Sequence, residues 1–199
     1  MSGRYRHAAL ALCLACAYGG GPALAQTGQD QELTSIDLCL DTSLDARHLM
    51  ETAQGRGFAP FLEAPEYYPS PPDQFVAGGR SPIPGGNASL AVQTSRIQRP
   101  GELAVQLTVC GVIGSQGHYL QIDQRLVERL GPPRGPYGQR SWTLQADGDQ
   151  LLPLTAETRG IPATSAVRVL PPGRKLVVVT LSGDNAAAAY EVRTYEVLD

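Results

Sequence analysis

The sequence lacks the spaced motifs that most metal and nucleotide sites require. It has no HExxH or HxxxH pair, no cysteine cluster, no Walker loop and no GxGxxG run. Asp147 and Asp149 in "ADGDQ" lack the further oxygen ligands and the distal Glu of a calcium loop, and a hairpin turn explains them better. We therefore expect neither a bound metal ion nor a cofactor.

Positive charge is also scarce. The chain has 16 Lys and Arg residues against 19 Asp and Glu residues, and Lys175 is the single lysine. Loss of an N-terminal leader with Arg4 and Arg6 would leave 14 against 19, a net charge near −5. Such a chain offers no basic face for general nucleic-acid binding and little attraction for anionic lipid. No later segment is apolar enough to span a membrane.

The N-terminus has the pattern of a bacterial secretory signal peptide. Arg4 and Arg6 precede an apolar run over 8–18, which is too short to cross a bilayer. Small residues at Ala23 and Ala25 then suit a signal peptidase, whereas a buried N-terminal helix is the weaker alternative. We predict that residues 1–25 are removed and that the remaining chain is soluble in the periplasm or outside the cell.

Cysteine is limited to four residues, and their positions indicate their chemistry. A lipid anchor at Cys16 is disfavoured because Cys13 stands where a lipidation signal has leucine. In an oxidising compartment Cys39 in "IDLCLD" and Cys110 in "LTVCGV" are expected to form a disulfide. A reactive thiol is the weaker alternative, because this pair has no CxxC spacing and no nearby His or Lys to lower a thiol pKa.

The rest of the chain predicts one α+β domain over residues 36–199, preceded by a loose polar segment over 26–35. One helix is expected to begin near Thr42 or Ser43 and to stop at Gly55. A second is expected over "HYLQIDQRLVERLG", which has apolar residues at helical spacing and ends in Gly-Pro-Pro.

Turn signals between apolar runs predict a mainly antiparallel sheet. Three hairpins are expected, around Pro100-Gly101, Asp147-Gly148 and Pro172-Gly173, with "AVRVL" as a strand of the third. In "LAVQLTVCGVI" the apolar stripe points away from Cys110, so Cys110 should face the other side of the sheet. The last segment, "AAAAYEVRTYEVL", is interpreted as a strand. Each half of the chain is a helix followed by strands, which suggests a duplicated unit.

A long irregular loop is predicted over residues 64–87. This range holds six prolines and four glycines, which is too broken a pattern for a long regular element. Loops of this length in small domains are uncommon and are often functional.

Candidate catalytic residues are few. His48 and His118 are the histidines outside the leader, and "GSQGH" places Ser115 close to His118. A nucleophile elbow would need glycine at position 113, where isoleucine stands, so Ser115 and His118 fit the start of a helix better. The carboxylates between Asp37 and Glu51 are explained by a helix N-terminus rather than by a glycosidase pair.

Two irregular loops, residues 64–87 and residues 131–142 ("GPPRGPYGQRSW"), contain Tyr, Trp and Arg. These residue types dominate binding hot spots. The stiff prolines of the two loops reduce the entropy lost on binding. The structural alternative is that the tyrosines of the first loop cover the sheet and that the tryptophan is core. The candidate binding residues are Tyr67, Tyr68, Arg134, Tyr137, Arg140 and Trp142.

The leading hypothesis is an exported binding module without enzymatic activity, stabilised by a disulfide. Its partner would be a protein, peptide or glycan of the cell envelope. A small periplasmic hydrolase that uses His48 or His118 is the alternative, and a structural envelope component is the third.

Overall fold

The computed structural model describes residues 27–198 with the exception of 42, 44, 63–73, 86, 99–100, 116, 155–160 and 185. The predicted signal peptide, Tyr67 and Tyr68 lie outside the described residues.

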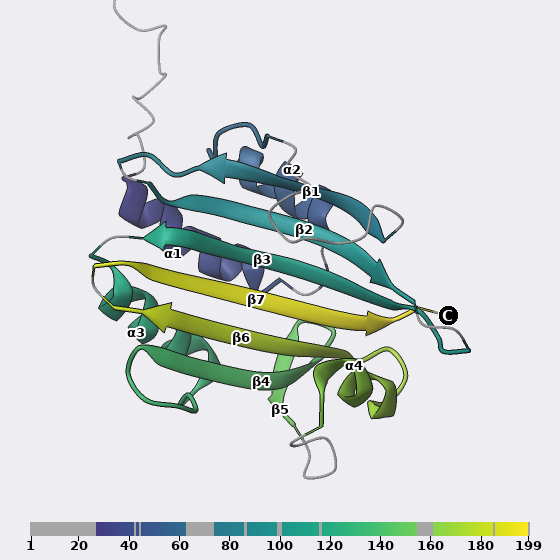
Figure 1. Ribbon diagram of the computed structural model, residues 1–199. Helices are drawn as coiled ribbons and strands as arrows, with labels where there is room; N and C mark the ends of the chain where they lie inside the picture. The colour runs from purple at the N-terminus through teal and green to yellow at the C-terminus, as the bar shows by residue number, and fades with distance from the viewer. Residues whose placement is uncertain are drawn as a thin grey trace, which may run out of the picture.

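The core element is one antiparallel sheet of seven strands in the order β1-β2-β3-β7-β6-β4-β5 (Figure 1). This confirms the predicted α+β fold with a mainly antiparallel sheet. The strands are β1 (Phe75–Pro82), β2 (Ser89–Ile97), β3 (Val105–Ser115), β4 (Gln139–Asp147), β5 (Gln150–Pro153), β6 (Lys175–Gly183) and β7 (Ala188–Val197).

Each half of the chain contributes neighbouring strands to this sheet. In the first half two helices precede β1, β2 and β3. In the second half one helix precedes β4 and β5, and a further short helix precedes β6 and β7. The last strand of each half lies at the centre, where β3 pairs with β7 from Val105 to Ser115. Both halves place helices before strands, but β5 and the short helix before β6 have no counterpart in the first half.

Three helices cover one face of the sheet. They are α1 (Gly28–Cys39), α2 (Ala46–Gly55) and α3 (Tyr119–Leu130), and Figure 1 shows α1 and α2 behind the strands. Their apolar side chains pack on the strand residues of that face and form the main core, which includes Ile36, Leu126, Val112 and Tyr190. Alternation along each strand supplies this core with every second side chain.

A smaller apolar cluster lies on the opposite face. Here α4 (Ala163–Ala166) and a 3-10 turn (Val167–Val169) pack near β6 and β7. The cluster contains Val167, Leu176 and Tyr195. The sequence "AVRVL" is therefore helical, and the prediction of a strand there is wrong. The following Pro172-Gly173 turn leads from this helix into β6 rather than joining two strands.

The predicted disulfide between Cys39 and Cys110 is confirmed. It joins the last residue of α1 to the middle of β3, with the two Cα atoms 5.2 Å apart. Cys110 faces away from Val105 and Val109, as alternation predicts. The face that carries Cys110 holds the main core, whereas Val105 belongs to the smaller cluster on the opposite face. The bridge therefore fastens α1 to the buried face.

The segment predicted to be loose, 26–35, is helical from Gly28. Thr27 and Asp30 form a capping box, in which each side chain binds the other's backbone N–H. The apolar pattern of α1 is weak because several of its buried residues are polar, Glu32 and Ser35 among them. Their partners lie far away in the sequence, so local periodicity did not reveal the helix.

The range predicted as a loop, 64–87, contains β1 over Phe75–Pro82, so the prediction is wrong for that part, whereas residues 64–73 lie outside the described residues. Glycines inside the strand mark close approach rather than irregularity. A Cβ atom on Gly79 would lie 2.9 Å from Met50 Sδ, and one on Gly78 would lie 2.9 Å from the carbonyl oxygen of Val92. Pro82 is tolerated because it ends an edge strand.

Among the described residues, no helix is long and apolar enough to cross a membrane.

Candidate functional site

The predicted loop after α3 is held in one conformation by its own backbone. Arg134 and Ser141 form an isolated antiparallel bridge, with N–H to O=C distances of 2.8 and 2.9 Å. The carbonyl oxygen of Gly135 also accepts a hydrogen bond from the guanidinium of Arg140 at 3.3 Å. Three prolines further restrict the chain between Gly131 and Gly138.

The first turn of α3 anchors the same loop. The backbone N–H of Gly138 donates to the hydroxyl of Tyr119 at 2.8 Å. The rings of Tyr119 and Tyr137 lie 4.5 Å apart and are tilted against each other, a favourable aromatic contact. Arg140 approaches the carboxylate of Asp123 at 3.6 Å. The loop is therefore fixed on a buried tyrosine rather than extended into solvent.

Trp142 does not belong to the exposed part of this loop. Its side chain faces the main core from β4, and only 3% of the residue is exposed. The indole N–H donates to the carbonyl oxygen of Gly131 at 2.8 Å, which satisfies the one polar atom of the ring. Trp142 is therefore a core residue, as the structural alternative in the sequence analysis proposed. Strand alternation turns its side chain inward.

Arg134 and Tyr137 do reach the surface, and two apolar residues of α3, the helix that anchors the loop, are exposed as well. Tyr137 is 50% exposed, Leu120 is 54% exposed and Val127 is 37% exposed. Leu120 and Val127 are seven residues apart and share one helix face, next to the face that carries Tyr119. We call Leu120, Val127, Arg134 and Tyr137 the loop surface. Helical spacing places both Leu120 and Val127 beyond the buried stripe of α3.

A second polar cluster lies where the start of α1 meets the end of β3. Glu32 is nearly fully buried, with 3% of the residue exposed. Its Oε2 atom accepts a hydrogen bond from Ser115 Oγ at 2.6 Å and contacts His118 Nδ1 at 2.7 Å. Burying a carboxylate is costly unless such partners compensate it. Ser115, His118 and Glu32 are thus brought together across more than eighty residues of sequence.

The buried hydrogen-bond network continues through α1 into the sheet. Ser35 donates to the backbone carbonyl of Glu32 at 2.6 Å, and the hydroxyl of Tyr190 on β7 donates to Ser35. Burial raises the pKa of Tyr190 above its ordinary value, so the phenol stays protonated. The network fixes α1 over the central strands.

His48 has a simpler environment than His118. Its Nδ1 lies 3.0 Å from Asp45, the residue that caps α2 and accepts the backbone N–H of His48. Both side chains are well exposed. Helix capping therefore accounts for this pair, and the cluster at His118 is the more unusual of the two.

No protein-family model, no curated protein and no solved structure matches the chain. Among the residues that the structure describes, no group of three or more His, Cys, Asp or Glu side chains could hold a metal ion.

Proposed function

We propose that the protein is an exported, disulfide-stabilised domain that binds a protein partner in the cell envelope through the loop surface. The observation that carries this proposal is an exposed Arg and Tyr on a loop that is already fixed. Tyr119, Asp123 and Ser141 hold the loop while Arg134 and Tyr137 face outward. A loop ordered before binding loses little conformational entropy when its partner arrives.

The chemistry of the loop surface indicates the kind of partner. Within the described part of the chain, the guanidinium of Arg134 forms no ion pair, and its planar fork suits a carboxylate. Tyr137 on the same loop, and Leu120 and Val127 on the helix that anchors it, supply exposed apolar area. The matching surface is therefore a protein patch with an acidic residue next to an apolar one. Tyr67 and Tyr68 remain a prediction as further contacts.

One kind of partner is disfavoured by the backbone of the loop. A substrate-like protease inhibitor places the carbonyl oxygen of the residue before the attacked bond in the oxyanion hole of the protease. If Arg134 were that residue, its carbonyl oxygen would have to be free, but it accepts the N–H of Ser141 at 2.9 Å. Inhibition of a trypsin-like protease through Arg134 is therefore not the function that we propose.

Charge reversal at the loop surface should abolish partner binding without unfolding the protein. We expect the double variant Arg134→Glu/Tyr137→Ala to weaken affinity at least about 30-fold, the effect of losing a hot spot of about 2 kcal/mol. The measurement is capture by the tagged protein from an envelope extract of its own host, followed by titration of the captured protein.

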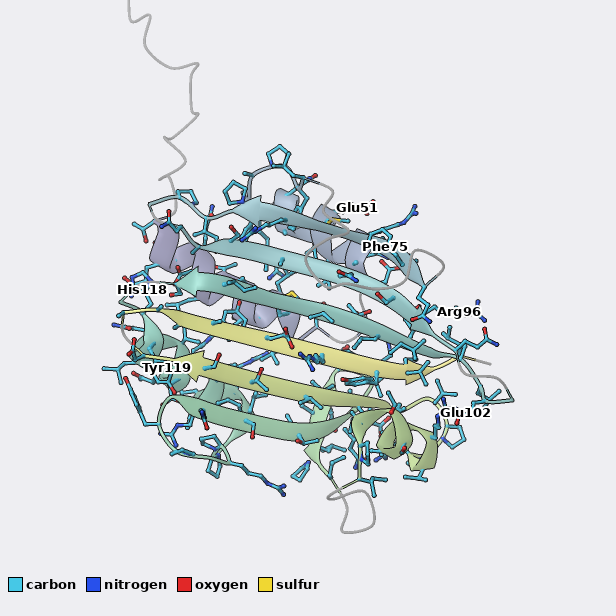
Figure 2. All side chains as sticks on the ribbon, viewed as in Figure 1. Glu51, Phe75, Arg96, Glu102, His118 and Tyr119 are labelled. Atoms are coloured by element: carbon cyan, nitrogen blue, oxygen red, sulfur yellow. A yellow bond between two sulfur atoms is a disulfide. The ribbon has the colours of Figure 1, made fainter. Side chains whose placement is uncertain are left out.

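Arg96→Glu is the matched control for this charge change. Arg96 is exposed, and Figure 2 shows it at the opposite end of the sheet from Tyr119. Its variant should bind like the wild type, and all three proteins should melt within about 2 °C of one another, because surface substitutions change stability little. Equal capture by all three proteins would exclude the loop surface as the binding site.

Tyr119→Phe tests whether the fixed loop conformation matters. The variant keeps the ring contact with Tyr137 but loses the hydroxyl that accepts the N–H of Gly138. We expect affinity for the captured partner to fall several-fold, with Arg134 and Tyr137 unchanged, because the loop must then be ordered on binding. Hydrogen exchange at Gly138 should rise in the same variant; faster exchange with unchanged affinity would contradict a role for pre-organisation.

A further inference from the structure

A pocket of about 290 Å³ opens beside His118, separate from the loop surface. Its walls come from the start of α1, the turn that joins β1 to β2, and the end of β3. In Figure 2, His118 lies at one end of the sheet, where β3 leads into α3. The walls are mostly glycine, proline and alanine, so the few polar groups determine what the pocket can bind.

The hydrogen-bond partner of His118 determines the tautomer of its ring. Glu32 Oε2 accepts from Ser115 and lies 2.7 Å from His118 Nδ1. A carboxylate can only accept, so the hydrogen bond requires the proton on Nδ1. In the neutral ring Nε2 then carries the lone pair, and within the described part of the chain it has no hydrogen-bond partner. This is the relation in which a carboxylate orients a histidine base.

Gly28 and Gln29, the first residues of α1, also line this pocket. The N–H groups of Gly28 and Gln29, at the start of α1, have no hydrogen-bond partner among the described residues, as is usual in a first helical turn. A Cβ atom on Gly28 would lie 2.0 Å from the carbonyl oxygen of Pro84, so glycine is required for this close packing. Helix N-termini favour negative charge.

We propose that His118 is the general base of a hydrolytic site for small uncharged esters, with Glu32 as its positioning residue. In the reaction, Nε2 takes a proton from water as the water oxygen bonds to the ester carbonyl carbon. The carbonyl electron pair moves onto its oxygen, beside the N–H groups of Gly28 and Gln29. The carbonyl then re-forms, the bond to the alcohol oxygen breaks, and the imidazolium returns its proton to that oxygen.

Water is the nucleophile because Ser115 is not available. Its side chain is fully buried, and its hydroxyl donates to Glu32 rather than to His118. The volume of the pocket, about 290 Å³, suits a small substrate. Buried Glu32, with no Lys or Arg in the pocket wall, disfavours anionic substrates.

The test is hydrolysis of phenyl acetate by the mature, oxidised protein, measured by phenol release. His118→Ala should lower kcat/KM at least about 100-fold, because general-base catalysis typically contributes that much or more. His48→Ala is the matched control, since His48 also pairs with a carboxylate through Nδ1, and its variant should keep full activity.

The positioning role of Glu32 is tested by the tautomer of the His118 ring, which is measured independently of the reaction rate. Nitrogen NMR of the wild type should show His118 protonated at Nδ1, and Glu32→Gln should change this tautomer balance and lower kcat. If Glu32→Gln fails to fold, the wild-type spectrum still tests the assignment. The proposal is overturned if wild type and folded His118→Ala hydrolyse phenyl acetate equally, if His48→Ala is the inactive variant, or if the neutral ring carries its proton on Nε2. None of these outcomes bears on capture by the loop surface.

Discussion

Replacing Cys39 and Cys110 together with alanine should lower the free energy of unfolding by about 4 kcal/mol. The bridge closes a loop of 71 residues in sequence, and the chain-entropy model assigns about that value to a loop of this length. It also joins α1 to the centre of the sheet, so the unbridged chain must dock this helix through packing and hydrogen bonds alone. For a domain of this size the melting temperature should fall by roughly 10 °C.

Calorimetry of three samples separates the bond from the packing of its sulfur atoms. The samples are the oxidised wild type, the wild type held reduced, and the double variant. The reduced wild type should account for most of the loss, because its side chains still fill the space around Cys110. Equal melting temperatures for the reduced and the oxidised wild type would show that the bridge contributes nothing to stability.

Most strands of the sheet, with the exception of β1, could be predicted from local sequence, whereas α1 could not. The strands β2, β3 and β7 have apolar and β-branched residues at a spacing that follows from burial. In α1, by contrast, Gln31, Glu32 and Ser35 are buried polar residues. Gln31 donates to the carbonyl oxygen of Gly57, and the other two have partners on β3, α3 and β7. No pattern within twelve residues contains these contacts.

The loop surface could also be predicted from local sequence, at least in part, whereas the cluster of Glu32, Ser115 and His118 could not. The composition of residues 131–142 indicated an exposed aromatic and basic loop, and Arg134 and Tyr137 are indeed exposed, while strand alternation turns Trp142 inward. The isoleucine at position 113 argued against a nucleophile elbow at Ser115, and Ser115 is bonded to Glu32. What the sequence could not show is Glu32 itself, because a residue then expected in a loose segment lies on a helix that covers the sheet.

Gly111→Ala should be among the most destabilising single substitutions in the chain. Gly111 lies in β3 between Ala91 and Glu191. A Cβ atom there would be 2.2 Å from the carbonyl oxygen of Tyr190 and 2.9 Å from the Cα atom of Glu191, both on the backbone of β7. The backbone cannot move aside as a flexible side chain would, so β3 and β7 must separate. We expect a loss of about 3 kcal/mol, the upper end of the cost of overpacking.

Gly55→Ala is the matched control, because a Cβ atom at Gly55 meets nothing within 4 Å and the residue ends a helix. That change should leave stability unchanged or raise it by up to about 1 kcal/mol, since alanine restricts the unfolded chain and favours the helix. Urea unfolding of both variants measures the difference. The strands β3 and β7 join the two halves, so Gly111→Ala should also loosen Tyr190 from Ser35 on α1. Equal midpoints for the two variants would mean that β3 and β7 are not packed as closely as described.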